Sequence, residues 1–398
     1  MLKMWNKNRR LIVDIETDSL DATTIHVVVT KDLGTKEVRS FRDRELFYTY
    51  IHSVPSYFIM HNGLSFDAPI LNRLWKAGIK ASDCIDTLLL SRLFNPIRES
   101  GHSLEAWGLR FGSPKIDFKK FEVYSEEMLQ YCKQDVEITE KLFFYLLDEG
   151  EDFSKECITL EHEVQHIINK QEQRGFNFDI RKAQLLLAEL MQKSKEIEIE
   201  ITDKWKPIVK MDKEIRLRYT KEGKLSKVGL SGVDNALATV GGDFSRIKYV
   251  PFNLSSRQQI SDRLIRLGWK PKKFTEKGQA IVDETVLSKI NIPEAKQIAE
   301  YLTLEKRNAQ IKAWLEAAEK DERVHGSVIT CGTITTRMAH NSPNLAQVPS
   351  ARKPYGEECR NCWIPSEGNS LIGIDASGLE LRMLAHYMNA VSYTHLRA

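Results

Sequence analysis

Three carboxylates in the first 70 residues stand at spacings that could hold divalent cations. Asp14 and Glu16 lie two residues apart in the apolar segment 11–16, and Asp67 follows the turn signal His61-Asn62-Gly63. Side chains of a strand alternate between its faces, so Asp14 and Glu16 would leave the same face of a strand. Like charges repel unless a cation lies between them, which favours a metal site. Taken alone, the pair also fits an ordinary surface strand.

A tyrosine and a fourth carboxylate follow in segment 126–147, whose periodicity predicts a helix. Tyr131 and Asp135 are four residues apart, which places both on one helical face. Taken singly, Tyr131 fits a half-buried aromatic residue and Asp135 fits a solvated helix charge. The order and spacing of all these pieces together are harder to obtain by chance.

The elements that must position these residues form a mixed α/β pattern. Apolar runs predict strands, and helical periodicity with turn signals predicts the helices between them. In the first 150 residues we expect strands at 11–16, 25–30 and 57–60 and helices at 68–77, 86–94 and 126–147. This order predicts a mixed sheet with helices packed on it.

The rest of the chain is predicted to be mainly helical. Segment 155–205 has helical periodicity, broken at Arg174-Gly175, with Asp179 as a cap for the second helix. We expect a loop-rich, basic insertion at 206–252, helices at 255–267 and 293–320, and a strand at 371–375 that leads into a helix from about Leu379.

Composition argues against membrane-spanning, disulfide-rich secreted and disordered proteins. The 398 residues are 42% hydrophobic and 28% charged, as in ordinary globular chains. Apolar runs are far shorter than the roughly 18 residues that span a bilayer, and the six cysteines show no regular disulfide spacing. Net charge is +3, with basic stretches at 201–230 and 246–280 that fit either a phosphate-facing surface or a solvated loop and helix face.

The carboxylates and the tyrosine together resemble the DEDD family of 3′→5′ exonucleases, in the variant whose third motif carries tyrosine. The resemblance implies that Asp14, Glu16, Asp67 and Asp135 bind two Mg²⁺ or Mn²⁺ ions about 3.5–4 Å apart, suited to in-line phosphodiester hydrolysis. One ion would activate a water and the other would stabilise the departing 3′-oxygen. Tyr131 would orient that water, while Asn62 and Phe66 would contact the terminal nucleotide.

A second set of motifs lies near the other end. Thr336-Arg337, Pro343 to Pro349 and Ile374 to Arg382 resemble the family A DNA polymerases, in particular those of small lytic podophages. The resemblance extends over about 11–389 and is poorest at 206–250. It implies an RNase H-like α/β exonuclease domain at 1–155, a mainly helical thumb at 156–325 and the start of an α+β palm at 326–390.

The same resemblance implies roles for individual palm and thumb residues. Asp375 would hold the polymerase metals with the carbonyl of Ala376, although an Asp at this position also fits a helix N-cap. Glu380 would block a ribose 2′-hydroxyl. The primer–template would be bound by a wider set of residues: Arg257, Arg337, Gln347 and the basic run Lys270–Lys273.

Departures from the family pattern set limits on these expectations. The fingers helix and the second palm carboxylate of the family lie beyond Asp375 and are absent here, so we expect exonuclease and DNA binding rather than polymerisation from the chain as given. Residues 391–398 are predicted to be a non-native tail. Segment 206–250 occupies the place where the phage enzymes carry a thioredoxin-binding insertion, but it is shorter and matches poorly. A processivity factor is therefore a partner that the sequence does not identify, and the poor match at 206–250 argues against thioredoxin in that role.

Two alternatives to a DNA polymerase fragment stay open at this point. One is a stand-alone nuclease of RNase-D type, against which the palm-like motifs argue; the other is a primer–template binding module without catalysis. Cys359 and Cys362 have a spacing that suits zinc, but no second pair accompanies them, which favours two incidental thiols. The resemblance places the protein in the cytoplasm of an infected bacterium.

Overall fold

The computed structural model describes residues 9–216, 218–223 and 243–388. The chain divides into two compact units. Unit 1 comprises residues 1–178, 317–348 and 364–398, and unit 2 comprises residues 179–316 and 349–363. The predicted tail 391–398 lies outside the described residues.

A five-stranded sheet forms the centre of unit 1. Its strands are β1 (Arg9–Thr17), β2 (Ile25–Asp32), β3 (Val38–Phe41), β4 (Ser56–Met60) and β5 (Cys84–Asp86), in the order β3-β2-β1-β4-β5. β1 pairs antiparallel with β2 and parallel with β4. The predictions of strands at 11–16, 25–30 and 57–60 are confirmed, and β1 is the central strand of the sheet.

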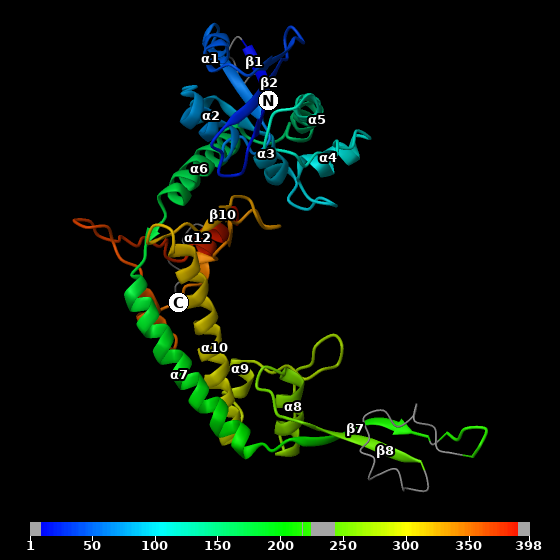
Figure 1. The fold of residues 1–398 in the computed structure, drawn as a ribbon. Coiled ribbons are helices and arrows are strands. Elements are labelled where there is room, and N and C mark those ends of the chain that lie inside the picture. The colour runs from blue at the N-terminus through cyan, green and yellow to red at the C-terminus, as the bar shows by residue number, and fades with distance from the viewer. Residues whose placement is uncertain (1–8, 217, 224–242, 389–398) are drawn as a thin grey trace. The chain divides into compact units, whose positions relative to one another are not determined.

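Helices surround this sheet (Figure 1). Leu11, Ile12 and Val13 of β1 are almost fully buried, because both faces of the central strand are covered. The helices of the first part are α1 (Arg44–His52), α2 (Asp67–Trp75), η2 (Ala81–Asp83), α3 (Thr87–Phe94), α4 (Leu104–Arg110), α5 (Glu126–Glu149) and α6 (Lys155–Arg174). The helices expected at 68–77, 86–94 and 126–147 are confirmed. β3, β5, α1 and α4 are short elements that the sequence pattern missed.

Later segments of unit 1 form short ribbons. β6 (Phe176–Asn177) pairs with β9 (Arg323–Val324), and β10 (Ser327–Ile329) pairs with β11 (Ala339–Asn341). The 3₁₀ turn η5 (Leu345–Gln347) and α12 (Leu379–Tyr387) follow. The helix expected from Leu379 is confirmed.

The strand expected at 371–375 is wrong. These residues have no regular structure, and Ile372 and Ile374 are 82% and 94% exposed. A strand needs backbone partners to satisfy its N–H and C=O groups. Within the described ranges, no segment pairs with this one.

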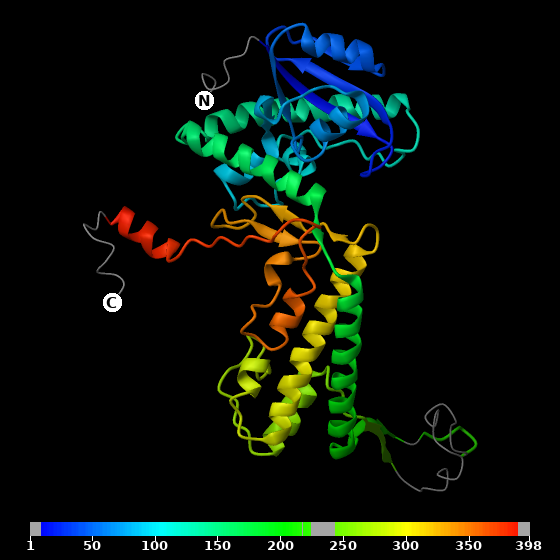
Figure 2. The same ribbon diagram turned by 90° about the vertical axis from the view of Figure 1, so that its left-hand side faces the viewer.

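Unit 2 is built on two long helices, α7 (Ile180–Lys204) and α10 (Pro293–Ala318), which run side by side in both views (Figures 1 and 2). Asp179 caps α7 by accepting a hydrogen bond from the N–H of Lys182, as expected. The predicted helices at 255–267 and 293–320 are confirmed as α8 (Arg257–Arg266) and α10. α9 (Glu284–Leu287) and α11 (Gly356–Arg360) complete the helices of this unit.

The prediction of a loop-rich insertion at 206–252 is wrong in part. β7 (Ile208–Ile215) and β8 (Phe244–Val250) pair as an antiparallel ribbon that projects from the helices of unit 2 (Figure 1). Polar and apolar residues do alternate in both strands: Val209 and Met211 pair with Tyr249 and Ile247 on one face, and Lys210 pairs with Lys248 on the other. The expectation of a loop missed this short pattern, which lies in a basic segment with several glycines. Residues 224–242 lie outside the described part. Across the described ranges, no helix combines the length and apolar character needed to cross a membrane.

Candidate active site

The carboxylates predicted to bind metal lie together in unit 1. Asp14 and Glu16 come from β1, Asp67 from the first turn of α2 and Asp135 from the middle of α5. All four line one cavity of ≈ 530 Å³. This volume falls in the range of small-ligand sites. The remaining lining residues include the predicted Asn62, Phe66 and Tyr131.

Strand β1 presents the first two carboxylates. Asp14 and Glu16 leave the same face, opposite Val29 and Val27 of β2, and the register shifts directly after Glu16. Such irregularities bend a strand and redirect its side chains, and they are common beside active sites. The Cys132 thiol of α5 donates to the Asp14 Oδ2 atom at 3.3 Å. Cys132 was not predicted, because its spacing in the sequence carries no sign of a contact with β1.

The loop between β4 and α2 sets the position of Asp67. The buried Asp86 carboxylate accepts hydrogen bonds from the backbone N–H groups of Asn62 and Leu64, both at 3.1 Å. Asn62 has a φ of 65°, and a Cβ on Gly63 would lie 2.1 Å from the Cβ of Met60, so only glycine fits there. The tight turn His61-Asn62-Gly63 thus leads from β4 to the first turn of α2, where Asp67 lies.

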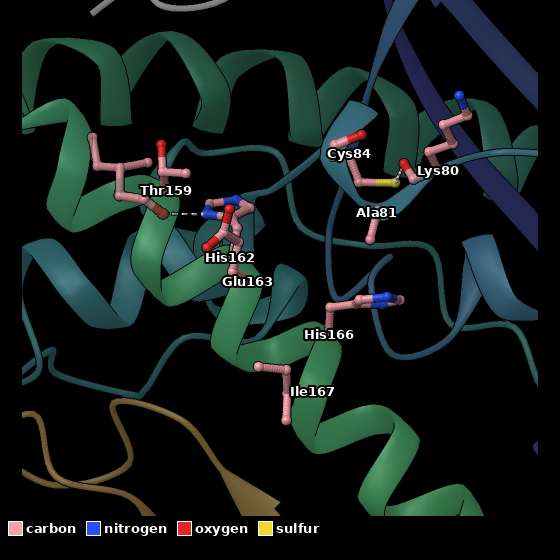
Figure 3. A pocket seen from close by; sticks show the side chains of 10 residues that line it. Lys80, Ala81, Cys84, Thr159, His162, Glu163, His166 and Ile167 are labelled. Carbon is pink, nitrogen blue, oxygen red and sulfur yellow. Dashed lines mark hydrogen bonds between the residues drawn. The ribbon is translucent and has the colours of Figure 1, made fainter.

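Asp86 is itself held by α6. The N–H of Asp86 donates to Nε2 of His162 at 3.1 Å, while Nδ1 of His162 bonds the Ile158 carbonyl at 2.8 Å. Burial lowers the pKa of His162, which keeps this imidazole neutral. Figure 3 shows His162 beside a separate cavity of ≈ 550 Å³ between α6 and the segment 80–84. None of the four predicted carboxylates lines that cavity, so it is not the predicted site.

A buried polar network holds the other side of the same loop. Asn169 of α6 donates to the Leu64 carbonyl at 2.7 Å and accepts from the Ser65 hydroxyl at 3.1 Å. Gln165 donates to Asn169 Oδ1 at 2.8 Å and accepts from the Thr330 hydroxyl. Because the bonds of Asn169 to Leu64 and to Gln165 are buried, the network fixes the loop in one arrangement. It also ties the loop to the residue that follows β10.

Lys115 is a site residue that the sequence did not reveal. Its Nζ lies 2.5 Å from Asp135 Oδ2 and 4.5 Å from the centre of the Tyr131 ring. It belongs to a segment without regular structure between α4 and α5, where no periodicity singles out one lysine. Tyr131 also packs against the rings of Phe118 and Phe121, at 5.6 and 6.0 Å between centroids.

The electrostatics of the cavity favour protonated carboxyl groups when no cation is present. Burial and then Asp135 raise the pKa of Glu16 to about 8, and burial raises the pKa of Asp67 to about 7. Burial, Asp135 and Glu16 also raise the pKa of Asp14 well above its usual value. For Asp135, burial raises the pKa although Lys115 opposes the shift. Repulsion between neighbouring carboxylates thus adds to the effect of burial on the pKa values of Asp14, Glu16 and Asp67.

The donor set fits divalent metal ions. Oδ1 of Asp135 is buried and has no hydrogen-bond partner, which is costly for a carboxylate oxygen unless a cation binds it. Ligand atoms of Asp14, Glu16 and Cys132 lie within 4.8 Å of one another. Hard oxygen ligands select Mg²⁺ or Mn²⁺, so Asp14, Glu16, Asp67 and Asp135 are the residues that would hold such ions.

Two apolar side chains border the carboxylates. Phe66 lines the cavity and is half-buried, while Leu20 lines it and is 89% exposed. Leu20 was not predicted, because a single leucine in a polar loop carries no pattern. Both residues also line an adjoining cavity of ≈ 790 Å³ in the same unit.

All of the predicted polymerase residues have exposed side chains. Asp375 and Ala376 lie in the exposed segment before α12, and Glu380 on α12 forms an exposed ion pair with Arg337 at 3.4 Å. Gln347 ends η5, and Arg257 begins α8 of unit 2. The thiols of Cys359 and Cys362 are buried, and in the described part of the chain they belong to no group of metal-ligating side chains.

Comparison with known proteins decides the family. The family model "DNA polymerase family A" matches residues 231–393. The DNA-directed DNA polymerases of Escherichia phage T7 and Enterobacteria phage T3 are each 30% identical over 491 aligned positions, which cover 95% of this chain and 69% of each relative. The chain belongs to family A of the DNA polymerases. Membership confirms the predicted enzyme class, DNA polymerase, and the predicted function in phage DNA replication at the level of the family.

Further relatives agree with this family. DNA polymerase I of Helicobacter pylori is 37% identical over 142 residues, 35% of this chain and 15% of that protein. The solved structure titled "POL domain of Pol1 from M. smegmatis complex with DNA primer-template and dNTP" has a TM-score of 0.69 at 16% identity, covering 98% of this chain and 61% of that one. This likeness shows a shared polymerase fold. The chain spans 69% of the length of the two phage polymerases.

Proposed function

We propose that the carboxylate cavity of unit 1 is a 3′→5′ exonuclease site that proofreads DNA 3′ ends. The observation that carries the proposal is the convergence of four buried or half-buried carboxylates from three elements on one cavity, with Asp135 Oδ1 left without a partner. The sheet order β3-β2-β1-β4-β5, antiparallel on one side of β1 and parallel on the other, supports an RNase H-like domain. Residues 156–325 then correspond to a mainly helical thumb, and residues 326–390 to the opening of a palm.

The residues of the cavity have different roles in hydrolysis. Asp14, Glu16, Asp67 and Asp135 would hold two divalent ions, which when bound would supply an activated water and charge stabilisation at the departing oxygen. Tyr131 lines the cavity, and its phenol orients the water by hydrogen bond. Burial raises the pKa of Tyr131 above its usual value, so its hydroxyl keeps its proton and donates.

The walls of the cavity select a frayed strand end. Phe66 and Leu20 offer apolar surface on which a terminal base stacks, and such stacking tolerates any base. Asn62 gives a polar contact beside them. Burial, with help from the positive charges of Lys115 and Arg92, lowers the pKa of His61 to about 3, so its imidazole lines the cavity in neutral form. A paired end would have to unpair by one or more nucleotides to reach these groups.

The palm and thumb residues serve the primer–template. Asp375 and the Ala376 carbonyl would hold the polymerase metals only together with further ligands, Glu380 would exclude ribose, and Arg337, Gln347 and Arg257 would bind the duplex. Family membership and the basic stretches at 201–230 and 246–280 support this part of the proposal. The place of action is the cytoplasm of an infected bacterium, and a processivity factor is an open partner.

Digestion of a 5′-labelled single-stranded DNA tests the exonuclease. With Mg²⁺, we expect a ladder that shortens from the 3′ end. EDTA, Asp14→Ala and Asp135→Ala should each lower the rate by about a thousandfold or more, equivalent to about 4 kcal/mol of lost transition-state stabilisation. Glu163→Ala, an exposed change on α6, is the matched control and should digest normally. A well-folded chain that leaves the DNA intact, or that prefers an RNA of the same sequence, contradicts the proposal.

A further inference from the structure

Lys115 approaches the carboxylate site from outside the cavity. Its Nζ forms the ion pair with Asp135 Oδ2 at 2.5 Å, and the two side chains are only 18% and 5% exposed. Lys115 does not line the cavity itself, whereas Asp135 and Tyr131 do. The ammonium group therefore acts on the site through these two neighbours.

The backbone on both sides of Lys115 is fixed to the helix that carries Asp135. The side chain of Gln134, the residue before Asp135, accepts from the N–H of Ile116 at 2.7 Å and donates to the Pro114 carbonyl at 2.8 Å. The side chain of Gln134 thus fixes the backbone on both sides of Lys115.

A second constraint comes from the end of α4. The N–H of Ser113 donates to the Gly108 carbonyl at 2.8 Å. A Cβ on Gly108 would lie 2.7 Å from the Ser113 carbonyl oxygen, so only glycine allows the segment to pack so closely. The turn that leads to Lys115 is therefore held against α4 as well as α5.

The two carboxylate oxygens of Asp135 have different environments. Oδ2 is held by Lys115, and Oδ1 is buried with no partner. An ammonium group is a compact charge that engages one oxygen, whereas the planar guanidinium of an arginine would form two parallel bonds to both. Lysine is therefore the cation that fixes this carboxylate and still leaves one oxygen for another ligand.

We propose that Lys115 is a positioning residue of the exonuclease site: it holds Asp135 so that Oδ1 faces the metal position, and it supports the ring of Tyr131. The inference rests on the proposed function. Gln134 contributes to this positioning, because its hydrogen bonds fix the backbone on both sides of Lys115. Groups of this kind orient metal ligands, and their loss weakens metal binding about 10–100-fold.

Calorimetric titration of the full chain with Mn²⁺ tests the inference without relying on hydrolysis. Lys115→Met should weaken Mn²⁺ binding about 10–100-fold, and Gln134→Ala should weaken it by a smaller factor in the same direction. Lys115→Arg should keep the melting temperature in EDTA near that of the parent but still weaken Mn²⁺ binding, since a guanidinium covers both oxygens of Asp135. A purely structural ion pair would recover both properties with arginine. Lys119→Met, at a lysine 81% exposed in the same segment, is the control and should change neither.

Several results would overturn the inference. Unchanged Mn²⁺ binding in folded Lys115→Met does so, as does full recovery of binding by Lys115→Arg. If Lys115→Met does not fold, Gln134→Ala decides, and Mn²⁺ binding equal to that of the parent rejects the inference. A parent chain that binds no Mn²⁺ rejects it together with the exonuclease. A parent chain that binds Mn²⁺ in a Lys115-dependent way but leaves DNA intact rejects the exonuclease alone.

Discussion

Two short apolar runs in unit 1 end in an aspartate, and their surroundings differ. Leu11 to Asp14 lies in β1, paired on both sides and covered by helices, whereas Leu371 to Asp375 has no regular structure and its isoleucines are largely exposed. The local sequences are alike. A strand forms only where other segments supply backbone partners and apolar cover, which β2, β4 and α5 do for β1.

The difference extends to the chemistry of the two aspartates. Asp14 lies among other carboxylates in a cavity, and its pKa is raised by burial and by its neighbours. Asp375 is exposed, and it does not line the cavity of the other predicted carboxylates. A carboxylate becomes a metal ligand through the groups that converge on it. The comparison therefore predicts large effects of substitutions near β1 and small effects near Asp375.

Asp86→Ala should have the largest effect on stability. Its buried carboxylate accepts from four backbone N–H groups: Asn62, Leu64, Leu88 and Leu89. Alanine leaves these donors without their acceptor, and each unsatisfied buried donor costs about 1–3 kcal/mol before relaxation. We expect the free energy of unfolding in urea to fall by about 3 kcal/mol and exonuclease activity to fall with it. A loss below about 1 kcal/mol would show that the loop does not depend on Asp86.

The pH dependence of stability should show an intermediate effect. The pKa of Glu16 is about 8 and that of Asp67 about 7, whereas unfolded carboxyl groups titrate near pH 4. Between pH 4 and pH 8 the folded chain binds more protons than the unfolded chain, so its stability in EDTA falls as the pH rises. We expect the melting temperature in EDTA to drop by about 5 °C from pH 5 to pH 8.

Mn²⁺ should remove this loss, because it binds the deprotonated carboxylates and stabilises the fold most at pH 8. Glu16→Gln is the matched variant: it cannot titrate, so its melting temperature in EDTA should depend less on pH. If the parent and Glu16→Gln show equal slopes, the carboxylates do not interact as the structure indicates.

Asp375→Ala should have the smallest effect. An exposed side chain without buried contacts changes the free energy of unfolding by less than about 0.5 kcal/mol. We also expect the Mn²⁺ affinity and the exonuclease rate to equal those of the parent. A clear loss of Mn²⁺ binding in this variant would place a second metal site at the segment before α12 and would show that an exposed Asp375 binds metal.

The sequence was most informative where a local pattern has a direct chemical meaning. The spacing of Asp14 and Glu16, and that of Tyr131 and Asp135, placed each pair on one face of its element, and the cavity contains all of them. Helices with good caps, such as α7 behind Asp179, were also predictable. The β7–β8 ribbon was not predicted, because its alternation of polar and apolar residues is short and lies in a basic segment with several glycines.

Contacts between distant segments account for the residues that were missed. Lys115 and Asp135 are joined across a loop, Asp86 and His162 across 76 positions, and Gln165 and Thr330 across 165. Local propensity carries no information about such pairs. Their partners come from elements whose periodicity describes only their own apolar faces.

By itself, the sequence determined the carboxylate set, the order of the main strands and helices, and the resemblance to family A polymerases. These depend on residue types and on the fixed periods of strands and helices. Only the tertiary structure decided which carboxylates share a cavity, that Lys115 holds one of them, and that Asp14 is enclosed while Asp375 is exposed. The physical reason is that burial, pairing and charge interaction depend on which segments meet in space.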